Sequence, residues 1–240
     1  MANTYTPQIR IPNVKKLFFG HVVWEVEICG NDYVVAELIA SNSWSTKKAS
    51  QLGNSTYNRG MLNSPDDEQK AERIGALAEI AYASVFKTSV CAETIEGGDA
   101  GYDFVTTDGT IDIKAFCMLN TISKDWRGLL RATTQSGDGI DLRAEMYAWI
   151  GIKEDRANRK ARAQFVGWQR AKRISKMPTR PSPRSDAGHS NHELSCRDLE
   201  AMTVFGPAVD NDIGQTLPVQ EAPRFRPTPF QRCSRVRLAA

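Results

Sequence analysis

Apolar residues recur at three- and four-residue spacing in one segment, which predicts a helix over about residues 65–86. Its buried stripe comprises Ile74, Leu77, Ala78, Ala81 and Val85. Ser64 suits an N-cap and Pro65 the first helical position, and the acids that follow complement the helix dipole. Glu79 borders the stripe, one turn after Gly75. We expect this helix to bring the Glu79 carboxylate to the edge of the core.

Alternating polar and apolar residues around Asp108-Gly109 predict a β-hairpin. A two-residue turn there places Val105 opposite Asp112 and Asp103 opposite Lys114. Because successive side chains alternate between faces, Asp103, Asp112 and Lys114 share one face. The other face carries three apolar residues, Phe104, Ile111 and Ile113. The two carboxylates are then diagonal neighbours roughly 7 to 8 Å apart at the backbone, a gap that a divalent cation bridges.

A plain surface hairpin is the alternative explanation, because Asp and Lys are common on solvated strands and often pair across them. The apolar neighbours of the second strand argue against it: Ile111, Ile113, Ala115, Phe116 and Cys117. A strand inside the protein must compensate an aspartate and a lysine on one face. The hairpin alone leaves a metal site and an ordinary ion pair equally open.

The remaining segments complete an α/β pattern. Strands are expected at Val22–Ile28 and at Tyr33–Leu38, joined at Gly30-Asn31, with a polar loop from Ser43 to Gly60. Further strands are expected at 144–152 and 163–168, the second followed by a short helix. We divide the chain into a β-rich N-terminal piece (1–60), a core (61–177), and a Pro/Arg-rich loop with a basic tail (178–240).

Composition restricts the class of protein. With 240 residues, 41% of them hydrophobic, the chain can bury a sizeable core. Its longest apolar run is far short of the roughly 20 residues needed to span a bilayer, so no membrane partner is expected. Five cysteines without Cys-x-x-Cys spacing are typical of a reduced, cytoplasmic protein.

Positive charge is concentrated between Lys153 and Arg184, where eleven lysines and arginines face only two acids. Such asymmetry favours a polyanionic partner, since each neutralised phosphate releases counterions. A solubilising loop and helix face is the alternative. The expected nucleic-acid contacts are Arg156, Arg159, Lys160, Arg162, Lys172 and Arg173.

Three motifs in order resemble the PD-(D/E)xK nuclease superfamily, which has the restriction-endonuclease-like fold. They are Gly75 to Glu79 on a helix, the glycine-rich run from Gly97 to Phe104, and Asp112-Ile113-Lys114. The likeness is greatest to phage and bacterial members and covers about residues 57–177. This chain departs from the idealised pattern in two places: Tyr102 precedes the first aspartate where proline is common, and the second acid is Asp112 rather than glutamate.

The resemblance implies a mixed central sheet flanked by helices, with N- and C-terminal elaborations and the active residues on a central hairpin and one helix. It implies catalytic roles for Glu79, Asp103, Asp112 and Lys114. Mg²⁺, with Mn²⁺ as a substitute, would be held by Asp103, Asp112 and the main-chain carbonyl of Ile113, with Glu79 as the completing ligand. Lys114 would orient the attacking water. DNA is the expected partner; RNA and a homodimer stay open, and the location would be a host cytoplasm if the chain is phage-encoded.

Three functions therefore compete. The first is a Mg²⁺-dependent nuclease that hydrolyses DNA, in phage-type DNA processing or degradation. The second is a non-catalytic DNA-binding member of the same fold. The third is an unrelated α/β interaction protein whose hairpin charges form only ion pairs.

Overall fold

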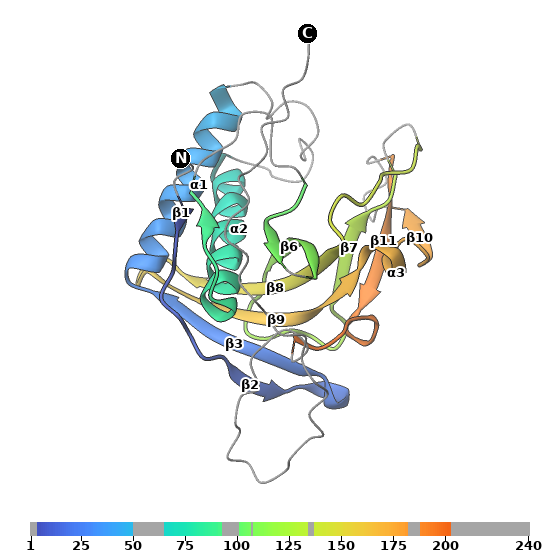
Figure 1. Ribbon diagram of the computed structural model, residues 1–240, viewed down its shortest axis with the longest axis horizontal. Coiled ribbons are helices and arrows are strands. Elements are labelled where there is room, and N and C mark those ends of the chain that lie inside the picture. Colours follow the sequence, from blue (N-terminus) through green and yellow to red (C-terminus); the bar gives the residue numbers. More distant parts are fainter. Residues whose placement is uncertain are drawn as a thin grey trace.

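The computed structural model describes residues 4–49, 65–92, 101–106, 108–133, 137–181 and 188–202. A six-stranded sheet forms its centre, in the order β2 (Asn13–Lys16), β3 (Val22–Cys29), β9 (Lys160–Arg170), β8 (Met146–Asp155), β6 (Gly109–Cys117) and β5 (Phe104–Thr106). β6 and β8 are parallel, whereas every other neighbouring pair in this sheet is antiparallel. The predicted α/β class with a mixed sheet and flanking helices is thereby confirmed (Figure 1).

Two long helices cover the first face of this sheet: α1 (Asn31–Ala49) and α2 (Pro65–Phe86). All five residues of the predicted α2 stripe are buried. They pack with Phe104, Ile111 and Ile113 of the hairpin, and the rings of Tyr82 and Phe104 lie 4.7 Å apart between centroids. The apolar side of the hairpin therefore faces α2.

A three-stranded sheet packs near the second face, in the order β10 (Thr179–Pro181), β11 (Ser190–Ser195) and β7 (Arg127–Arg131). Leu130 of β7 and Leu194 of β11 share a second core with Tyr147 and Trp149 of β8. The short helix α3 (Ala171–Ile174) follows β9 and buries Ile174 in the same core. β6 is seen between α2 and β7 in Figure 1.

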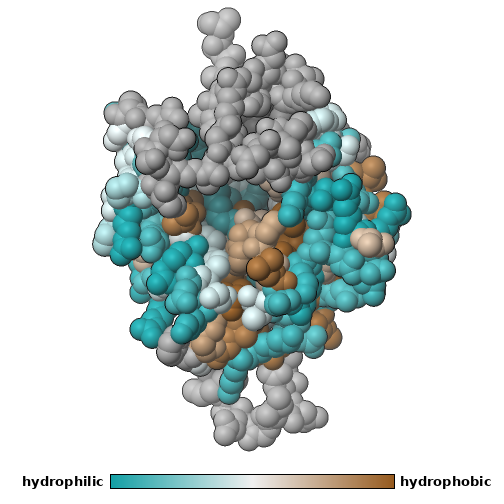
Figure 2. Space-filling model, turned by 180° about the vertical axis from the view of Figure 1, so that it is seen from behind, coloured by the Kyte–Doolittle hydropathy of each residue, from teal (hydrophilic) through white to brown (hydrophobic). Residues whose placement is uncertain are grey.

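Smaller elements complete the described part. β1 (Thr4–Tyr5) pairs with β4 (Val90–Cys91), and two 3-10 turns lie at Phe18–Gly20 and Cys196–Asp198. On the face drawn in Figure 2, hydrophobic residues gather in the middle with hydrophilic residues on both sides. No helix in the described ranges is long and apolar enough to cross a membrane.

The prediction of a strand at Tyr33–Leu38 is wrong, because these residues lie inside the 19-residue helix α1. Val34 and Val35 suggested a strand, yet both are only half-buried, while Tyr33, Ala36 and Ala40 form the buried side with helical spacing. Gly30, with a φ of +61°, ends β3 and turns the chain into the helix. The loop expected from Ser43 also begins too early, since α1 continues to Ala49.

Part of the loop expected after Met177 is β structure, because Thr179–Pro181 forms β10 and β11 begins at Ser190. The predicted helix 65–86 and the strands at 22–28, 144–152 and 163–168 all exist, with β8 and β9 longer than expected. Ser64, the 97–100 part of the glycine-rich run, and the basic tail lie outside the described residues.

Candidate functional site

The hairpin exists, but its register differs by two residues from the prediction. Phe104 pairs with Ile111 and Thr106 with Gly109, so the turn lies one residue earlier than Asp108-Gly109. The Thr106 side chain closes this turn: its hydroxyl donates to the Gly109 carbonyl (2.8 Å) and accepts from the Asp108 N–H (3.2 Å). Because a shift of two residues is even, each side chain keeps its predicted face.

Glu145, at the start of β8, fixes the position of the turn from outside. Its Oε2 accepts the Thr110 N–H at 3.1 Å, and its own N–H donates to the Thr110 hydroxyl at 3.1 Å. A Cβ on Gly109 would come within 1.6 Å of Glu145 Oε2, and Gly109 has a φ of +125°. The positive φ favours glycine at the first residue of β6, and a larger residue there would also displace the Glu145 carboxylate from Thr110.

Asp103 lies just before β5 and is bound to β6 through both its main chain and its side chain. Its N–H donates to the Ile111 carbonyl (2.8 Å), and its Oδ2 accepts the Ile113 N–H (2.6 Å). In an antiparallel pair, the N–H and C=O of one residue point to the same neighbour. The Ile113 carbonyl therefore faces the same strand edge as the Asp103 carboxylate.

Asp112 and Lys114 follow on the same strand, and their side chains form an ion pair of 2.7 Å. The Asp112 side chain is 16% exposed and that of Lys114 29%, so water and a ligand reach both. Asp103, Ile113, Asp112 and Lys114 thus lie together at the beginning of the hairpin. We call these four residues the hairpin site.

Tyr147 of β8 is a neighbour of the hairpin site that the sequence did not reveal. It pairs with Asp112 across the parallel strands, and the Lys114 ammonium lies 5.7 Å from its ring centroid. Burial raises the pKa of Tyr147, and the Asp112 charge raises it further, while the Ala144 N–H and Lys114 act in the opposite direction. Only the pairing of β6 with β8 brings this tyrosine to Asp112, and no local motif indicates that pairing.

The role of Glu79 at the hairpin site stays a prediction. Glu79 belongs to α2, which packs on the face that carries Ile111 and Ile113. Asp112 and Lys114 alternate with these residues and so lie on the opposite face. Glu72, two turns earlier on the helix, accepts a hydrogen bond from Ser43 of α1 (2.8 Å). In the described residues, α2 thus supports the hairpin by packing.

The hairpin also lies at an edge of the described sheet, with β5 as the last strand, and not at its centre as expected. Among the described residues, β5 pairs with β6 from Phe104 to Thr106, and before Phe104 the Asp103 carboxylate binds the Ile113 N–H. The donor set there, two carboxylates and a carbonyl, matches the oxygen ligands that Mg²⁺ prefers. No cluster of three or more His, Cys, Asp or Glu side chains occurs among the described residues.

The six predicted nucleic-acid contacts divide into two groups at opposite ends of the sheet. The first, which we call the distal group, lies at or beside the β8–β9 turn and comprises Arg156, Arg159, Lys160 and Arg162. Nine residues of extended chain separate Tyr147 from Arg156, which is roughly 30 Å. Ion pairs within the protein occur in both groups: Lys160 lies 3.7 Å from Glu27, Arg162 lies 3.5 Å from Glu25, and Arg173 lies 3.9 Å from Glu200.

Lys172 and Arg173 lie at the other end, beside the hairpin site. They belong to α3, whose first N–H, from Ala171, donates to the Glu145 carbonyl at 2.9 Å. Glu145 in turn holds Thr110 of the hairpin. Arg143 lies close by as well, since a Cβ on Gly101 would come within 2.5 Å of its Cδ. The positive φ of Gly101 (+87°) accompanies this close approach, two residues before Asp103.

Comparison with known proteins gave no match, since neither a family model, a curated protein nor a solved structure corresponds to this chain.

Proposed function

We propose that this protein is a Mg²⁺-dependent nuclease of the PD-(D/E)xK type that hydrolyses phosphodiester bonds of DNA. The observation that carries the proposal is the hydrogen bond from the Ile113 N–H to the Asp103 carboxylate, beside the Asp112–Lys114 ion pair. This contact supports a shared metal position for the Asp103 and Asp112 carboxylates and the Ile113 carbonyl. An ordinary ion pair between Asp112 and Lys114 would not require a second carboxylate, that of Asp103, bound to the main chain of the residue between them.

Each residue of the hairpin site then has a distinct role. Asp103, Asp112 and the Ile113 carbonyl would hold Mg²⁺, which supplies charge neutralisation at the phosphate and lowers the pKa of a bound water. Lys114 donates to the attacking water and stabilises the charge that develops on the phosphoryl oxygens. The Tyr147 ring, 5.7 Å from the Lys114 amine, restricts the positions that the ammonium adopts. Glu79 stays the predicted completing ligand.

A cleavage assay tests the proposal directly. Circular and linear DNA, single- and double-stranded, is incubated with the protein in Mg²⁺ or in EDTA. Asp112→Ala should abolish cleavage while DNA binding persists or tightens, because a carboxylate facing the phosphate is gone. Asp125→Ala is the matched control, since Asp125 is an exposed loop aspartate whose own N–H is bound by Ser123.

The outcomes separate the three competing functions. Metal-dependent cleavage that Asp112→Ala abolishes and Asp125→Ala retains supports the nuclease. Binding of DNA without cleavage of any topology would leave a non-catalytic DNA-binding protein. A chain that neither binds nor cleaves would leave the hairpin charges as ion pairs of an interaction protein.

The two basic groups predict which end of the sheet meets the DNA. Neutralising Lys172 and Arg173 together should lower the slope of log K against log salt by up to about two. Neutralising Arg159 and Lys160, in the distal group, should leave that slope unchanged, because these residues lie roughly 30 Å from the hairpin site. Equal effects of the two double variants would place the DNA along the whole sheet.

A further inference from the structure

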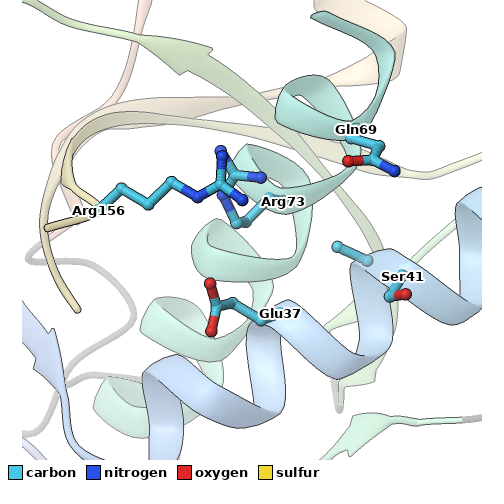
Figure 3. Close-up of a pocket in the computed structure, with 6 residues that line it drawn as sticks. Glu37, Ser41, Gln69, Arg73 and Arg156 are labelled. Atoms are coloured by element: carbon cyan, nitrogen blue, oxygen red, sulfur yellow. The ribbon is translucent and has the colours of Figure 1, made fainter. Parts of the chain in front are cut away.

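A pocket of about 200 Å³ opens between α1, α2 and the β8–β9 turn, on the helix side of the sheet (Figure 3). It is lined by Glu37, Ala40, Ser41, Gln69, Arg73 and Arg156. Its volume is below the roughly 300–1,000 Å³ that is typical of pockets for drug-sized ligands. A ligand of a few non-hydrogen atoms with its hydration shell fits this space.

Buried charges hold one wall of the pocket rigid. Arg73 is only 8% exposed and donates two hydrogen bonds to the Glu154 carboxylate, one from Nε and one from Nη2, the second with a length of 3.0 Å. The Tyr33 hydroxyl donates to the same carboxylate at 2.7 Å. The hydrogen bond to Glu154 raises the pKa of Arg73, which keeps its positive charge. The Arg73 guanidinium is thus fixed in place before any ligand arrives.

The other polar groups line the pocket without a side-chain hydrogen bond among the described residues. Arg73 and Arg156 both line the pocket, and their guanidinium groups overlap in the view of Figure 3, above the Glu37 carboxylate. Four lining residues have no side-chain hydrogen bond or ion pair within the described part of the chain: Glu37, Ser41, Gln69 and Arg156. Arg73 is already compensated by Glu154, whereas the Arg156 guanidinium keeps its donors available to an anion in the pocket.

We propose that this pocket binds a protonated phosphate, in the form of monohydrogen phosphate. Guanidinium groups recognise phosphate oxygens well, and Ser41 and Gln69 supply further donors. Glu37 decides the protonation state of the ligand. An ionised carboxylate only accepts hydrogen bonds, so it repels a fully ionised oxyanion but accepts the P–OH proton of monohydrogen phosphate. Sulfate has no such proton at neutral pH, and neither does a phosphodiester of nucleic acid.

The pocket is separate from the hairpin site. It lies against α1 and α2, whereas Asp112 and Lys114 lie on the opposite face of the sheet. Arg156 is also roughly 30 Å along β8 from Tyr147. A phosphate held here is therefore not the scissile group, and the proposal stands whether or not the protein cleaves DNA.

Calorimetric titration of the full chain with phosphate, sulfate and dimethyl phosphate tests the proposal. The wild type should bind phosphate saturably, with sulfate and dimethyl phosphate at least about tenfold weaker. Arg156→Ala should reduce phosphate affinity by about tenfold or more. Arg159→Ala is the matched control, because Arg159 belongs to the same turn and does not line the pocket; it should bind phosphate as the wild type does.

Glu37→Gln provides the decisive arm. The amide donates where the carboxylate only accepts, so this variant should bind sulfate about as tightly as phosphate. Wild-type protein that binds no phosphate, or that binds dimethyl phosphate equally well, overturns the proposal. So does an unchanged preference for phosphate over sulfate in Glu37→Gln. Thermal melts of every variant confirm that each compared protein is folded.

Discussion

Replacing Asp103 by asparagine or by alanine separates its structural from its chemical role. Alanine removes the acceptor of the Ile113 N–H, now bonded over 2.6 Å. A donor left unsatisfied in this half-buried place costs about 1–3 kcal/mol. For a chain of this size each kcal/mol lowers Tm by about 2–4 °C, so we expect a fall of roughly 2–12 °C. Asparagine offers an amide oxygen to the same N–H and should cost less than about 1 kcal/mol.

Thermal melts and Mg²⁺-dependent cleavage are measured on the same preparations. We expect Asp103→Asn to melt close to the wild type and yet to lose cleavage, because its neutral amide is a weak Mg²⁺ ligand. Asp103→Ala should lose both. An asparagine variant that cleaves like the wild type would refute the metal role of Asp103. An asparagine variant as unstable as alanine would refute the hydrogen bond as the source of stability.

Three further outcomes concern buried or half-buried tyrosines. Tyr33→Phe loses a 2.7 Å hydrogen bond to Glu154 and should lower the free energy of unfolding in urea by about 1.5–3 kcal/mol. Tyr82→Phe removes a buried hydroxyl that has no partner among the described residues, so it should leave the free energy of unfolding unchanged or raise it. Burial alone would raise the pKa of Glu154, but the hydrogen bonds from Arg73 and Tyr33 outweigh it and lower that pKa. The resulting stability is present above the unfolded-state pKa and is lost as pH falls through the folded-state pKa. The unfolding free energy should therefore fall less steeply from pH 7 to pH 3 in Tyr33→Phe than in the wild type, and an identical slope would contradict this. Tyr147→Leu should slow cleavage about two- to fivefold at unchanged DNA affinity, which is an increase of about 0.5–1 kcal/mol in the activation free energy. Tyr147→Phe keeps the ring and should cleave at the wild-type rate. Equal rates for the two variants would show that the ring has no role in cleavage.

The sequence predicts local structure well where a periodic pattern and its terminus signals agree. The stripe that includes Leu77 and Val85 identifies α2 with its observed end at Phe86. Alternation places Asp112 and Lys114 on one face of the hairpin, and this is what the structure shows. The register could not be predicted, because Thr106 closes the turn through its hydroxyl while Asp108-Gly109 is the more familiar turn signal.

Features that depend on distant segments could not be derived from the sequence. The β-branched pair Val34-Val35 suggests a strand, but packing of α1 on α2 makes it helical. Basic residues close in sequence, such as Arg159 and Lys172, become distant because β9 runs the length of the sheet between them. Tyr147 reaches Asp112 only through the parallel pairing of β6 and β8. The role of the hairpin site in catalysis stays a prediction.

The bulge between β8 and β9 changes how mutational tolerance along β9 should be interpreted. Trp149 pairs with Gly167 but Ile150 with Phe165, so Val166 is an extra residue. Before it, odd-numbered residues such as Phe165 face the helices; after it, the even-numbered Trp168 does. A saturation scan should therefore show its period-two pattern of sensitive positions reverse phase at Val166. Deleting that single residue would remove the bulge and restore regular alternation, with Phe165 and Trp168 both still facing the helices.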